Sequence, residues 1–346
     1  MKALKLVSPG TIELQEVPIP EIGADEVLIK VAGAGLCQSD LHILEMDESW
    51  PFFGGTMGHE TAGYVDRVGS QVTGYKLGDA VLVSVIWGCG HCRACTVGRD
   101  NACATNGNRT QFPTTPGIGP DGGMAEYMKV RARHLDRIGD LDPASAAPLA
   151  DAGVTPMHAI NNVRDRLTPD ATAVVIGVGG LGHMALQILS ATAGSRVVAV
   201  DTDESRLRSA RMIGADSALR NDETTVSRIL DETQGYGVDV VLDFVGTQDT
   251  IDMTRRIVAP EGTVQLIGLG GGTLSYPTGS DGPNLPWGVR FQRSYGGTRV
   301  DQLEVIALAQ QGKATVHTVP YPLADASRAF DDLAQGRISG RAVLIP

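Results

Sequence analysis

The alternation of hydrophobic and polar positions divides the chain into a β-rich first part and an α/β second part. In the first part, short runs rich in β-branched residues predict strands at 3–7, 26–31, 63–68 and 80–85. Glycine and proline turns separate these runs. Short strands between such turns favour a compact, mostly antiparallel domain over residues 1–152, with loops that carry the chemistry.

The pattern changes after residue 152. Residues 153–167 look helical, and helical segments then alternate with strands predicted at 173–176, 196–200, 239–242 and 263–267. Alternation of this kind predicts a parallel sheet covered by helices on both faces. We expect this second domain to occupy residues 153–293.

The last segment, residues 294–346, has a helical stretch at 302–310 and a final run, Arg341-Ala342-Val343-Leu344-Ile345. We expect it to pack back onto the first domain. The predicted fold class is therefore α/β, with one mostly antiparallel domain and one doubly wound parallel-sheet domain.

Length, charge and cysteine content narrow the function. A chain of 346 residues suits two domains, and its net charge of -11 disfavours nucleic acid and anionic membranes as partners. The chain starts with a short β-like run rather than a signal peptide, and no apolar stretch reaches the length of about 18 residues that a membrane span needs. We expect a cytoplasmic protein whose five cysteines are thiols or metal ligands.

A glycine-rich run at the start of the second domain predicts a dinucleotide site. Residues 177–182, Gly177-Val178-Gly179-Gly180-Leu181-Gly182, match G-x-G-x-x-G between a predicted strand and an apolar helical segment. The glycines permit a tight turn and a close approach to a pyrophosphate, and the helix N-terminus offers free N–H groups. The alternative is a glycine-rich turn that only packs a helix on a sheet.

Asp201 indicates which dinucleotide binds. It ends the next predicted strand, nineteen residues after Gly182. A carboxylate there can accept hydrogen bonds from the adenosine ribose hydroxyls and repels the 2′-phosphate of NADP. The sequence therefore predicts NAD(H).

Four cysteines within fifteen residues predict a structural metal site. Their spacing is C-x2-C-x2-C-x7-C, and four thiolates close a tetrahedral zinc site without an open position; the residues are Cys89, Cys92, Cys95 and Cys103. A zinc knuckle that binds nucleic acid is the alternative. The acidic charge and the lack of a basic or aromatic cluster disfavour it.

A second metal site is suggested by the fifth cysteine. Cys37 and the downstream pair His59-Glu60 supply the ligand types of a catalytic zinc that keeps one position open for substrate. Spacing alone does not show that Cys37 and His59 meet, and a lone histidine is more often structural than a ligand.

Together these motifs resemble the medium-chain, zinc-containing alcohol dehydrogenases over essentially the whole chain. The pattern Gly58-His59-Glu60-x2-Gly63-x5-Gly69-x2-Val72 fits the zinc signature of that family, and the four-cysteine segment fits its structural zinc loop. The resemblance implies a GroES-like catalytic domain at 1–152 and 294–346, a Rossmann domain at 153–293, NAD(H), and two zinc ions per chain.

The resemblance also implies a ligand set. Cys37, His59 and Asp151 would hold the catalytic zinc, and Glu60 would approach the metal during ligand exchange. Many members have cysteine where this chain has Asp151. In having aspartate at this position, the chain resembles a bacterial branch that includes secondary alcohol dehydrogenases and aryl aldehyde or ketone reductases. Asp40 would accept the second imidazole N–H of His59 and fix its tautomer.

For catalysis, the resemblance implies that Ser39 contacts the substrate oxygen and that His42 ends a proton relay to solvent. The segment 266–269 would lie along the nicotinamide, and Arg341 would reach the pyrophosphate. The predicted cofactor-binding residues are Gly177, Gly179, Gly180, Leu181, Gly182, Asp201, Arg206, Gly268, Leu269, Arg341 and Thr155. The aromatic residues that could form apolar pocket walls are Trp50, Phe52, Trp87 and Tyr295, for which core packing is the alternative.

The expected function is NAD-dependent, reversible oxidation of hydrophobic secondary or aryl alcohols to ketones or aldehydes. A polyol or primary alcohol dehydrogenase of the same family is the alternative. A zinc-free quinone or enoyl reductase would lack the set Cys37, His59 and Asp151, and a non-enzymatic NAD-binding protein would have no use for a proton relay. Members of the family form dimers or tetramers, and we expect a homotetramer.

Overall fold

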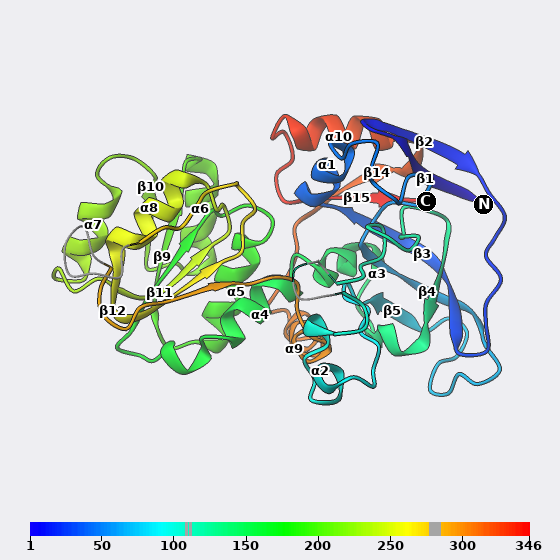
Figure 1. Cartoon of the computed structure of the whole chain (residues 1–346), viewed down its shortest axis with the longest axis horizontal. Coiled ribbons are helices and arrows are strands. Elements are labelled where there is room, and N and C mark those ends of the chain that lie inside the picture. The colour runs from blue at the N-terminus through cyan, green and yellow to red at the C-terminus, as the bar shows by residue number, and fades with distance from the viewer. Residues whose placement is uncertain (108–109, 111–112, 277–284) are drawn as a thin grey trace. The chain divides into compact units, whose positions relative to one another are not determined.

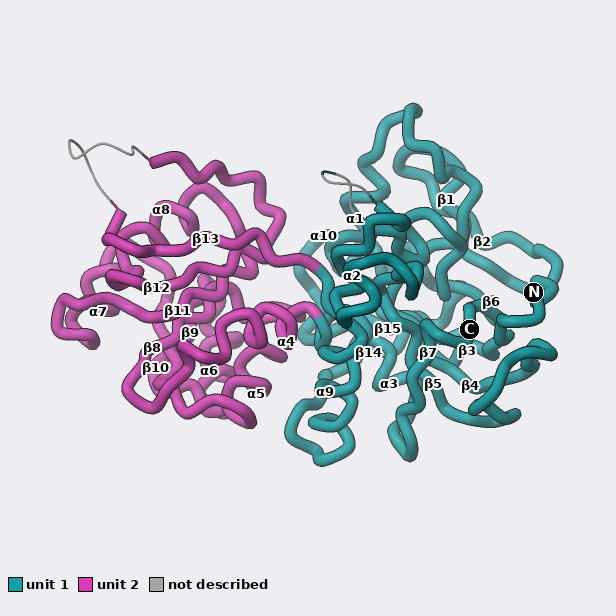
Figure 2. The backbone as a smooth tube through the Cα atoms, turned by 60° about the horizontal axis from the view of Figure 1, so that its bottom comes forward, with its two compact units in different colours: residues 1–154, 296–346 teal, residues 155–295 magenta. Residues whose placement is uncertain are grey.

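The computed structural model describes residues 1–107, 110, 113–276 and 285–346, and it divides the chain into two compact units. Unit 1 comprises Met1–Val154 and Gly296–Pro346, and unit 2 comprises Thr155–Tyr295 (Figure 2). The boundaries expected from the sequence lie two residues before these positions. Among the described residues, no helix is both long and apolar enough to cross a membrane.

The centre of unit 1, as far as the structure describes it, is a seven-stranded sheet with the order β14-β15-β3-β4-β5-β7, in which β6 also pairs with β3 (Figure 1 and Figure 2). Its neighbouring strands run antiparallel except β14 and β15, which confirms the mostly antiparallel domain. The strands are β3 (Glu26–Leu36), β4 (Glu60–Val68), β5 (Ala80–Val83), β6 (Tyr127–Arg131), β7 (Leu135–Arg137), β14 (Thr318–Pro322) and β15 (Arg341–Ile345).

Two buried clusters form the core of unit 1. One joins Val27, Val81 and Leu135 of the sheet, and the other packs Leu36 against Phe330 of a C-terminal helix. The remaining elements are the pair β1 (Lys2–Ser8) and β2 (Thr11–Glu16), the helices α1 (Gln38–Leu44), α2 (Arg93–Thr96), α3 (Pro143–Ala146), α9 (Arg299–Gln310) and α10 (Ala326–Ala334), and the 3₁₀ turns η1 (Asp100–Ala102), η2 (Ala132–His134), η3 (Ala147–Ala150) and η5 (Leu323–Asp325).

Unit 2 contains, within its described residues, a six-stranded parallel sheet with the order β10-β9-β8-β11-β12-β13. This confirms the predicted Rossmann-type domain. Its elements are α4 (Val154–Asn161), which begins at the unit boundary, η4 (Arg164–Arg166), β8 (Thr172–Ile176), α5 (Gly182–Thr192), β9 (Arg196–Asp201), α6 (Glu204–Ile213), β10 (Ser217–Arg220), α7 (Thr225–Glu232), β11 (Val238–Asp243), α8 (Gln248–Ile257), β12 (Val258–Leu266) and β13 (Arg290–Arg293).

The strand order of unit 2 reverses between β8 and β11, and this reversal locates its binding edge. Strands of a parallel sheet are nearly continuously apolar because helices cover both faces, and β8 has four consecutive buried residues. In open sheets of this kind, ligands bind at the carboxyl ends of the strands beside the point of reversal. The glycine run follows β8 at this edge.

Element ends differ from the predictions by a few residues. The strand expected at 80–85 ends at Val83, where the Ser84 N–H donates to the His134 carbonyl oxygen instead of a sheet neighbour. The helical region 153–167 forms α4 and a separate 3₁₀ turn. The strand expected at 263–267 begins earlier, at Val258, and its pairing with β11 shifts register before Thr263.

Candidate metal and cofactor sites

Sheet pairing brings Cys37 and His59 together. The antiparallel register places Gly35 of β3 opposite Glu60 of β4, so Cys37 and His59 lie at adjoining strand ends. An ideal Cβ on Gly35 would lie 2.0 Å from Oε2 of Glu60, so glycine is needed there to admit the buried carboxylate. The predicted strands were too short to reveal this register.

Helix α1 begins directly after Cys37 and places a carboxylate beside the histidine. Oδ2 of Asp40 accepts the Cys37 N–H at 2.8 Å, and Oδ1 of the same carboxylate lies 3.4 Å from Nδ1 of His59. Burial lowers the pKa of His59, but the Asp40 charge and then contacts with Asp151 and Cys37 raise it well above the ordinary value. With Nδ1 facing Asp40, His59 presents Nε2 to the other candidate ligands, 3.8 Å from Oδ2 of Asp151.

Asp151, at the end of η3, completes the cluster. Its Oδ2 lies 3.5 Å from Sγ of Cys37, and the candidate ligand atoms of Cys37, His59, Glu60 and Asp151 all lie within 4.8 Å of one another. Zinc–sulfur and zinc–oxygen bond lengths in a tetrahedral site imply a sulfur–oxygen separation of about 3.6 Å. The donor types and their spacing therefore fit a zinc ion.

Arg341 enters the same cluster from β15. Its Nε lies 3.1 and 2.9 Å from Oε1 and Oε2 of Glu60, and its Nη2 also donates to Oε1. The same Nη2 lies 3.5 Å from Oδ2 of Asp151. Burial raises the pKa of Glu60, and the Arg341 charge partly offsets that rise. The structure thus places Arg341 on two acidic residues of unit 1, while its contact with a pyrophosphate stays a prediction.

The predicted relay residues lie on α1. Oγ of Ser39 is 3.7 Å from Sγ of Cys37, and His42 follows three residues later. Residues three apart on a helix share a face, and both side chains are partly exposed. The proton relay itself stays a prediction.

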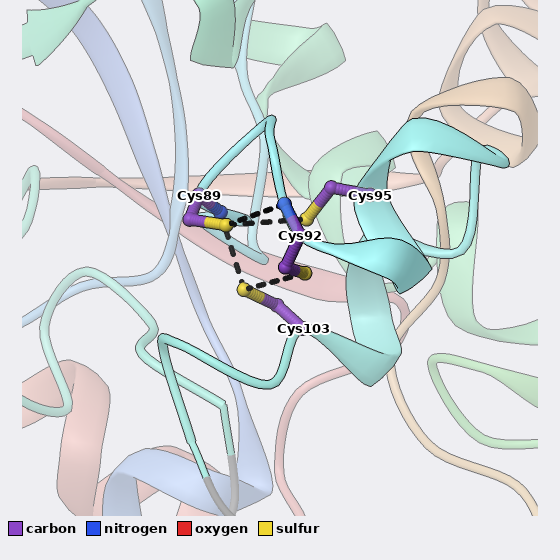
Figure 3. A group of neighbouring side chains, drawn as sticks. All are labelled: Cys89, Cys92, Cys95 and Cys103. Atoms are coloured by element: carbon purple, nitrogen blue, oxygen red, sulfur yellow. Dashed lines mark hydrogen bonds between the residues drawn. The ribbon is translucent and has the colours of Figure 1, made fainter.

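The four cysteines of the 89–103 segment converge in unit 1 (Figure 3). Their sulfurs lie 4.0 Å apart for Cys89 and Cys95 and 3.9 Å apart for Cys92 and Cys103. A tetrahedral zinc with four thiolates needs sulfur separations of about 3.8 Å, so this group also fits zinc. Hydrogen bonds from Thr105 and from the His91 backbone lower the pKa of Cys89 to about 5, which favours the thiolate that a metal binds.

In unit 2, the glycine run forms an open turn before α5. Gly177 has φ +85, and an ideal Cβ on Gly182 would lie 1.8 Å from the Gly177 carbonyl oxygen. Apart from the residue itself and its chain neighbours, no described atom lies within 4 Å of an ideal Cβ on Gly179, so the chain leaves space there beside the first N–H groups of α5. This cradle fits the pyrophosphate of a dinucleotide.

Asp201 lies at the carboxyl end of β9, beside the glycine turn. Its Oδ2 accepts the Val178 N–H at 2.7 Å, and its Oδ1 accepts the Asp203 N–H at 2.9 Å. The guanidinium of the exposed Arg206 lies 3.8 Å from Oδ2. The link between the carboxylate and the glycine turn was not anticipated from the sequence, where Asp201 was considered only for its action on the ribose.

The remaining predicted cofactor residues are distributed along unit 2 and β15. Thr155 is buried in α4, whereas Gly268 and the exposed Leu269 follow β12. Their contacts with a cofactor stay predictions.

The four aromatic side chains have different surroundings. Trp50 meets Phe52 edge to face, with ring centroids 5.2 Å apart. Trp87 stacks on His134 at 5.3 Å, and its indole N–H donates to the Ser84 carbonyl oxygen at 2.9 Å. These contacts give Trp87 a packing role in unit 1. Tyr295 is the last residue of unit 2, and burial raises its pKa.

Comparison with known proteins decides the family. The family model described as the alcohol dehydrogenase GroES-like domain matches residues 23–140, and that of the zinc-binding dehydrogenases matches residues 180–311. The NAD-dependent alcohol dehydrogenase of Sulfurisphaera tokodaii is 34% identical, with 100% of both chains covered. The chain belongs to the zinc-binding alcohol dehydrogenase family. The resemblance seen in the sequence motifs is thereby confirmed.

Two further proteins that are similar to this chain differ in their named activities. The crystal structure of the Aeropyrum pernix alcohol dehydrogenase has a TM-score of 0.90 and 34% identity, with 100% of both chains covered. The D-arabinose 1-dehydrogenase (NADP(+)) of Saccharolobus solfataricus is 33% identical over 97% of this chain and 94% of its own. The chain is an oxidoreductase of this family, and its two groups of ligands are compatible with two zinc sites.

Proposed function

We propose that the chain is an NAD-dependent zinc alcohol dehydrogenase that reversibly oxidises an alcohol to a ketone or an aldehyde. The observation that carries this function is the convergence of Cys37, His59 and Asp151 in unit 1. A zinc ion held by these residues supplies a Lewis acid for the substrate oxygen, and NAD supplies the hydride acceptor. The four-cysteine site holds a second, structural zinc.

The residues around the ligands orient them and move the substrate proton. Asp40 holds His59 with Nε2 toward the cluster. Ser39 accepts the proton of the substrate hydroxyl as it gives up its own, and that proton passes by way of a cofactor ribose hydroxyl to His42, which releases it to solvent. Support for this relay comes from the short distance between Ser39 and Cys37 and from the shared helix face.

We assign the cofactor as NAD because of the carboxylate of Asp201. The acid ends the strand next to the glycine turn and is fixed by two backbone N–H groups. A buried carboxylate at the adenosine ribose favours two free hydroxyls over a 2′-phosphate. Gly268, Leu269, Arg206, Thr155 and Arg341 complete the cofactor contacts in this proposal.

For the substrate we favour a hydrophobic secondary or aryl alcohol. Asp151 in place of a cysteine ligand and the aromatic residues Trp50, Phe52 and Tyr295 support this choice. A primary alcohol or a polyol is the second candidate, and the name of the D-arabinose dehydrogenase relative gives reason to test it.

The deciding experiment is a steady-state screen with NAD that compares 1-phenylethanol, 2-butanol, 1-butanol and sorbitol by kcat/KM. The purified enzyme should oxidise 1-phenylethanol best, and a preference for sorbitol or 1-butanol contradicts the substrate assignment. Cys37→Ser and Asp151→Asn should abolish turnover while NADH still binds, as measured by fluorescence titration. Full turnover in either variant, or after chelation of the catalytic zinc, contradicts the metal-dependent function.

We further propose a cytoplasmic homotetramer. The reducing cytoplasm suits a chain whose five cysteines all serve as metal ligands, and the tetramer follows from the resemblance to family members. Light scattering on the purified zinc-loaded protein measures the assembly, and a monomeric mass contradicts this proposal.

A further inference from the structure

Strand β11 ends at a carboxylate that is closed off from solvent. Asp243 has 0% exposure, and its Oδ1 accepts the Val245 N–H at 2.9 Å and the Gly246 N–H at 3.0 Å. A buried acceptor that satisfies two backbone N–H groups is costly to remove, because both donors then lose their partner. The side chain therefore fixes the turn at residues 244–247.

On one side, this turn touches the glycine turn of the dinucleotide site. Asp243 lies opposite Ile176, the last residue of β8, and the Phe244 N–H donates to the Ile176 carbonyl oxygen at 2.9 Å. An ideal Cβ on Gly177 would lie 2.6 Å from Cγ2 of Val245. The turn at 244–247 thus packs directly against the start of the glycine run.

On the other side, the same turn supports the segment at 267–272. The Asp243 carbonyl oxygen accepts the N–H groups of Ile267 at 2.8 Å and Gly268 at 3.0 Å. The Val245 carbonyl oxygen accepts the Gly270 N–H at 3.0 Å. An ideal Cβ on Gly268 would lie 2.2 Å from the carbonyl carbon of Val245, so the two backbones are in direct contact.

We propose that Asp243 is a positioning residue for the nicotinamide half of the cofactor. Its carboxylate holds the turn at 244–247, and that turn fixes the backbone of Gly268 and Leu269. This inference rests on the proposed function, in which Gly268 and Leu269 lie along the nicotinamide ring. Asp201, at the end of a different strand, acts on the adenosine half, so the two halves depend on different carboxylates.

The test compares two ligands that differ only in the nicotinamide ring. For Asp243→Ala in the zinc-loaded enzyme, calorimetric titration should show NADH affinity falling about tenfold or more, because the backbone along the nicotinamide ring loses its support and must be ordered when the ring binds. The affinity for ADP-ribose should fall by a clearly smaller factor, because the bond that joins the turn to β8, from the Phe244 N–H to the Ile176 carbonyl oxygen, does not involve the Asp243 carboxylate. Asp243→Asn keeps an acceptor oxygen and should remain close to wild type for both ligands.

A matched control lies at the opposite end of the same strand. Oδ2 of Asp239 accepts the Thr172 N–H at 2.8 Å, so Asp239→Ala removes a comparable side-chain-to-backbone bond away from the binding edge. It should not separate the affinities for NADH and ADP-ribose. An equal loss of both ligands in Asp243→Ala, no loss of NADH, or the same separation in Asp239→Ala overturns the inference.

A second variant keeps the test available if Asp243→Ala does not fold. Gly246→Ala places a Cβ 2.3 Å from the Gly268 carbonyl oxygen while Asp243 stays intact. It should weaken NADH selectively, and unchanged NADH affinity in this variant contradicts the positioning role. If the wild-type enzyme binds neither ligand, the proposed NAD dependence fails instead, which is a separate outcome.

Discussion

The guanidinium of Arg341 forms a buried, forked ion pair with the carboxylate of Glu60. The two side chains are 7% and 0% exposed. Burial lowers the pKa of Arg341, but the negative charges of Cys37, Glu60 and Asp151 together raise it well above its ordinary value. The arginine therefore stays charged and provides the positive charge among the acidic groups of the cluster.

Arg341→Met should destabilise unit 1 strongly. It leaves the carboxylate of Glu60 buried without its partner, and losses of about 3–5 kcal/mol are typical when one member of a buried pair is removed. Urea unfolding of the zinc-loaded protein measures the free energy of unfolding. The double variant Glu60→Gln, Arg341→Met is the control, because it removes both charges.

The double variant should be more stable than Arg341→Met alone. This outcome follows because a buried pair is costly mainly when only one charge remains. If the effects of the two single substitutions simply add, the ion pair does not couple these residues.

Loss of the two zinc sites should have different effects on stability and turnover. Cys103→Ser removes one thiolate of the four-cysteine site, so zinc content by mass spectrometry should fall from two ions to one and thermal stability should drop, since structural zinc contributes directly to folding. Cys37→Ser should also lose one zinc, but it should lose turnover and keep most of its stability. Retention of two zinc ions in Cys103→Ser contradicts the structural site.

Local patterns in the sequence were sufficient to predict much of the fold. Alternating apolar runs indicated the strands, and the spacing of four cysteines and of the glycine run indicated two binding sites. These signals are local, because the residues that act together lie within a few positions of each other along the chain.

The cluster around Cys37 could not be predicted in the same way. Its members lie at or directly beside the ends of β3, β4, η3 and β15, and only the register of the sheet brings Cys37 next to His59 and Arg341. Only the resemblance to the family joins Cys37, His59 and Asp151 at the level of sequence. Asp243 ends an apolar strand as Asp201 does, but it was not recognised because no spacing rule connects it with the glycine run.

Asp201→Asn should change cofactor preference more cleanly than Asp201→Ser. Asparagine keeps an oxygen that can accept the Val178 N–H, whereas serine is too short to do so and should also loosen the glycine turn. Loss of the negative charge in Asp201→Asn should therefore lower kcat/KM for NAD about tenfold. It should raise kcat/KM for NADP, because the nearby guanidinium of Arg206 can then pair with the 2′-phosphate. Both values come from initial rates with each cofactor.

Asp203→Asn is the matched control for this prediction. Asp203 lies two residues after Asp201 and caps α6 by accepting the Ser205 N–H. Unlike Asp201, it is exposed. It should keep the wild-type preference for NAD. An unchanged preference in Asp201→Asn contradicts the assignment of NAD to this carboxylate.

The relay residues Ser39 and His42 should differ in their dependence on pH. Ser39→Ala should lower kcat at least about 100-fold, the usual size of a lost proton-transfer group. His42→Ala should have a smaller effect that shrinks at high pH, where hydroxide can take the proton directly. Profiles of kcat against pH measure both, and a His42→Ala defect of constant size at all pH values contradicts the relay.

His134 should make the folded state sensitive to acid. The side chain stacks on Trp87, and burial together with the charge of Arg133 lowers its pKa to about 3. In the unfolded chain its pKa returns to about 6.5, so between these values the unfolded state binds a proton that the folded state does not. Stability from this group is therefore complete above the unfolded pKa and is lost as the pH falls toward the folded pKa.

His134→Phe should remove this part of the acid sensitivity, because phenylalanine keeps an aromatic ring for the stack and binds no proton. Through this histidine, the free energy of unfolding of the wild type should be about 2 kcal/mol lower at pH 5 than at pH 7. The variant should not show this part of the decrease. Urea unfolding at both pH values measures the difference. His317→Phe, at an exposed histidine of the same unit, should follow the wild-type profile. If His134→Phe also follows that profile, the acid sensitivity does not arise from His134.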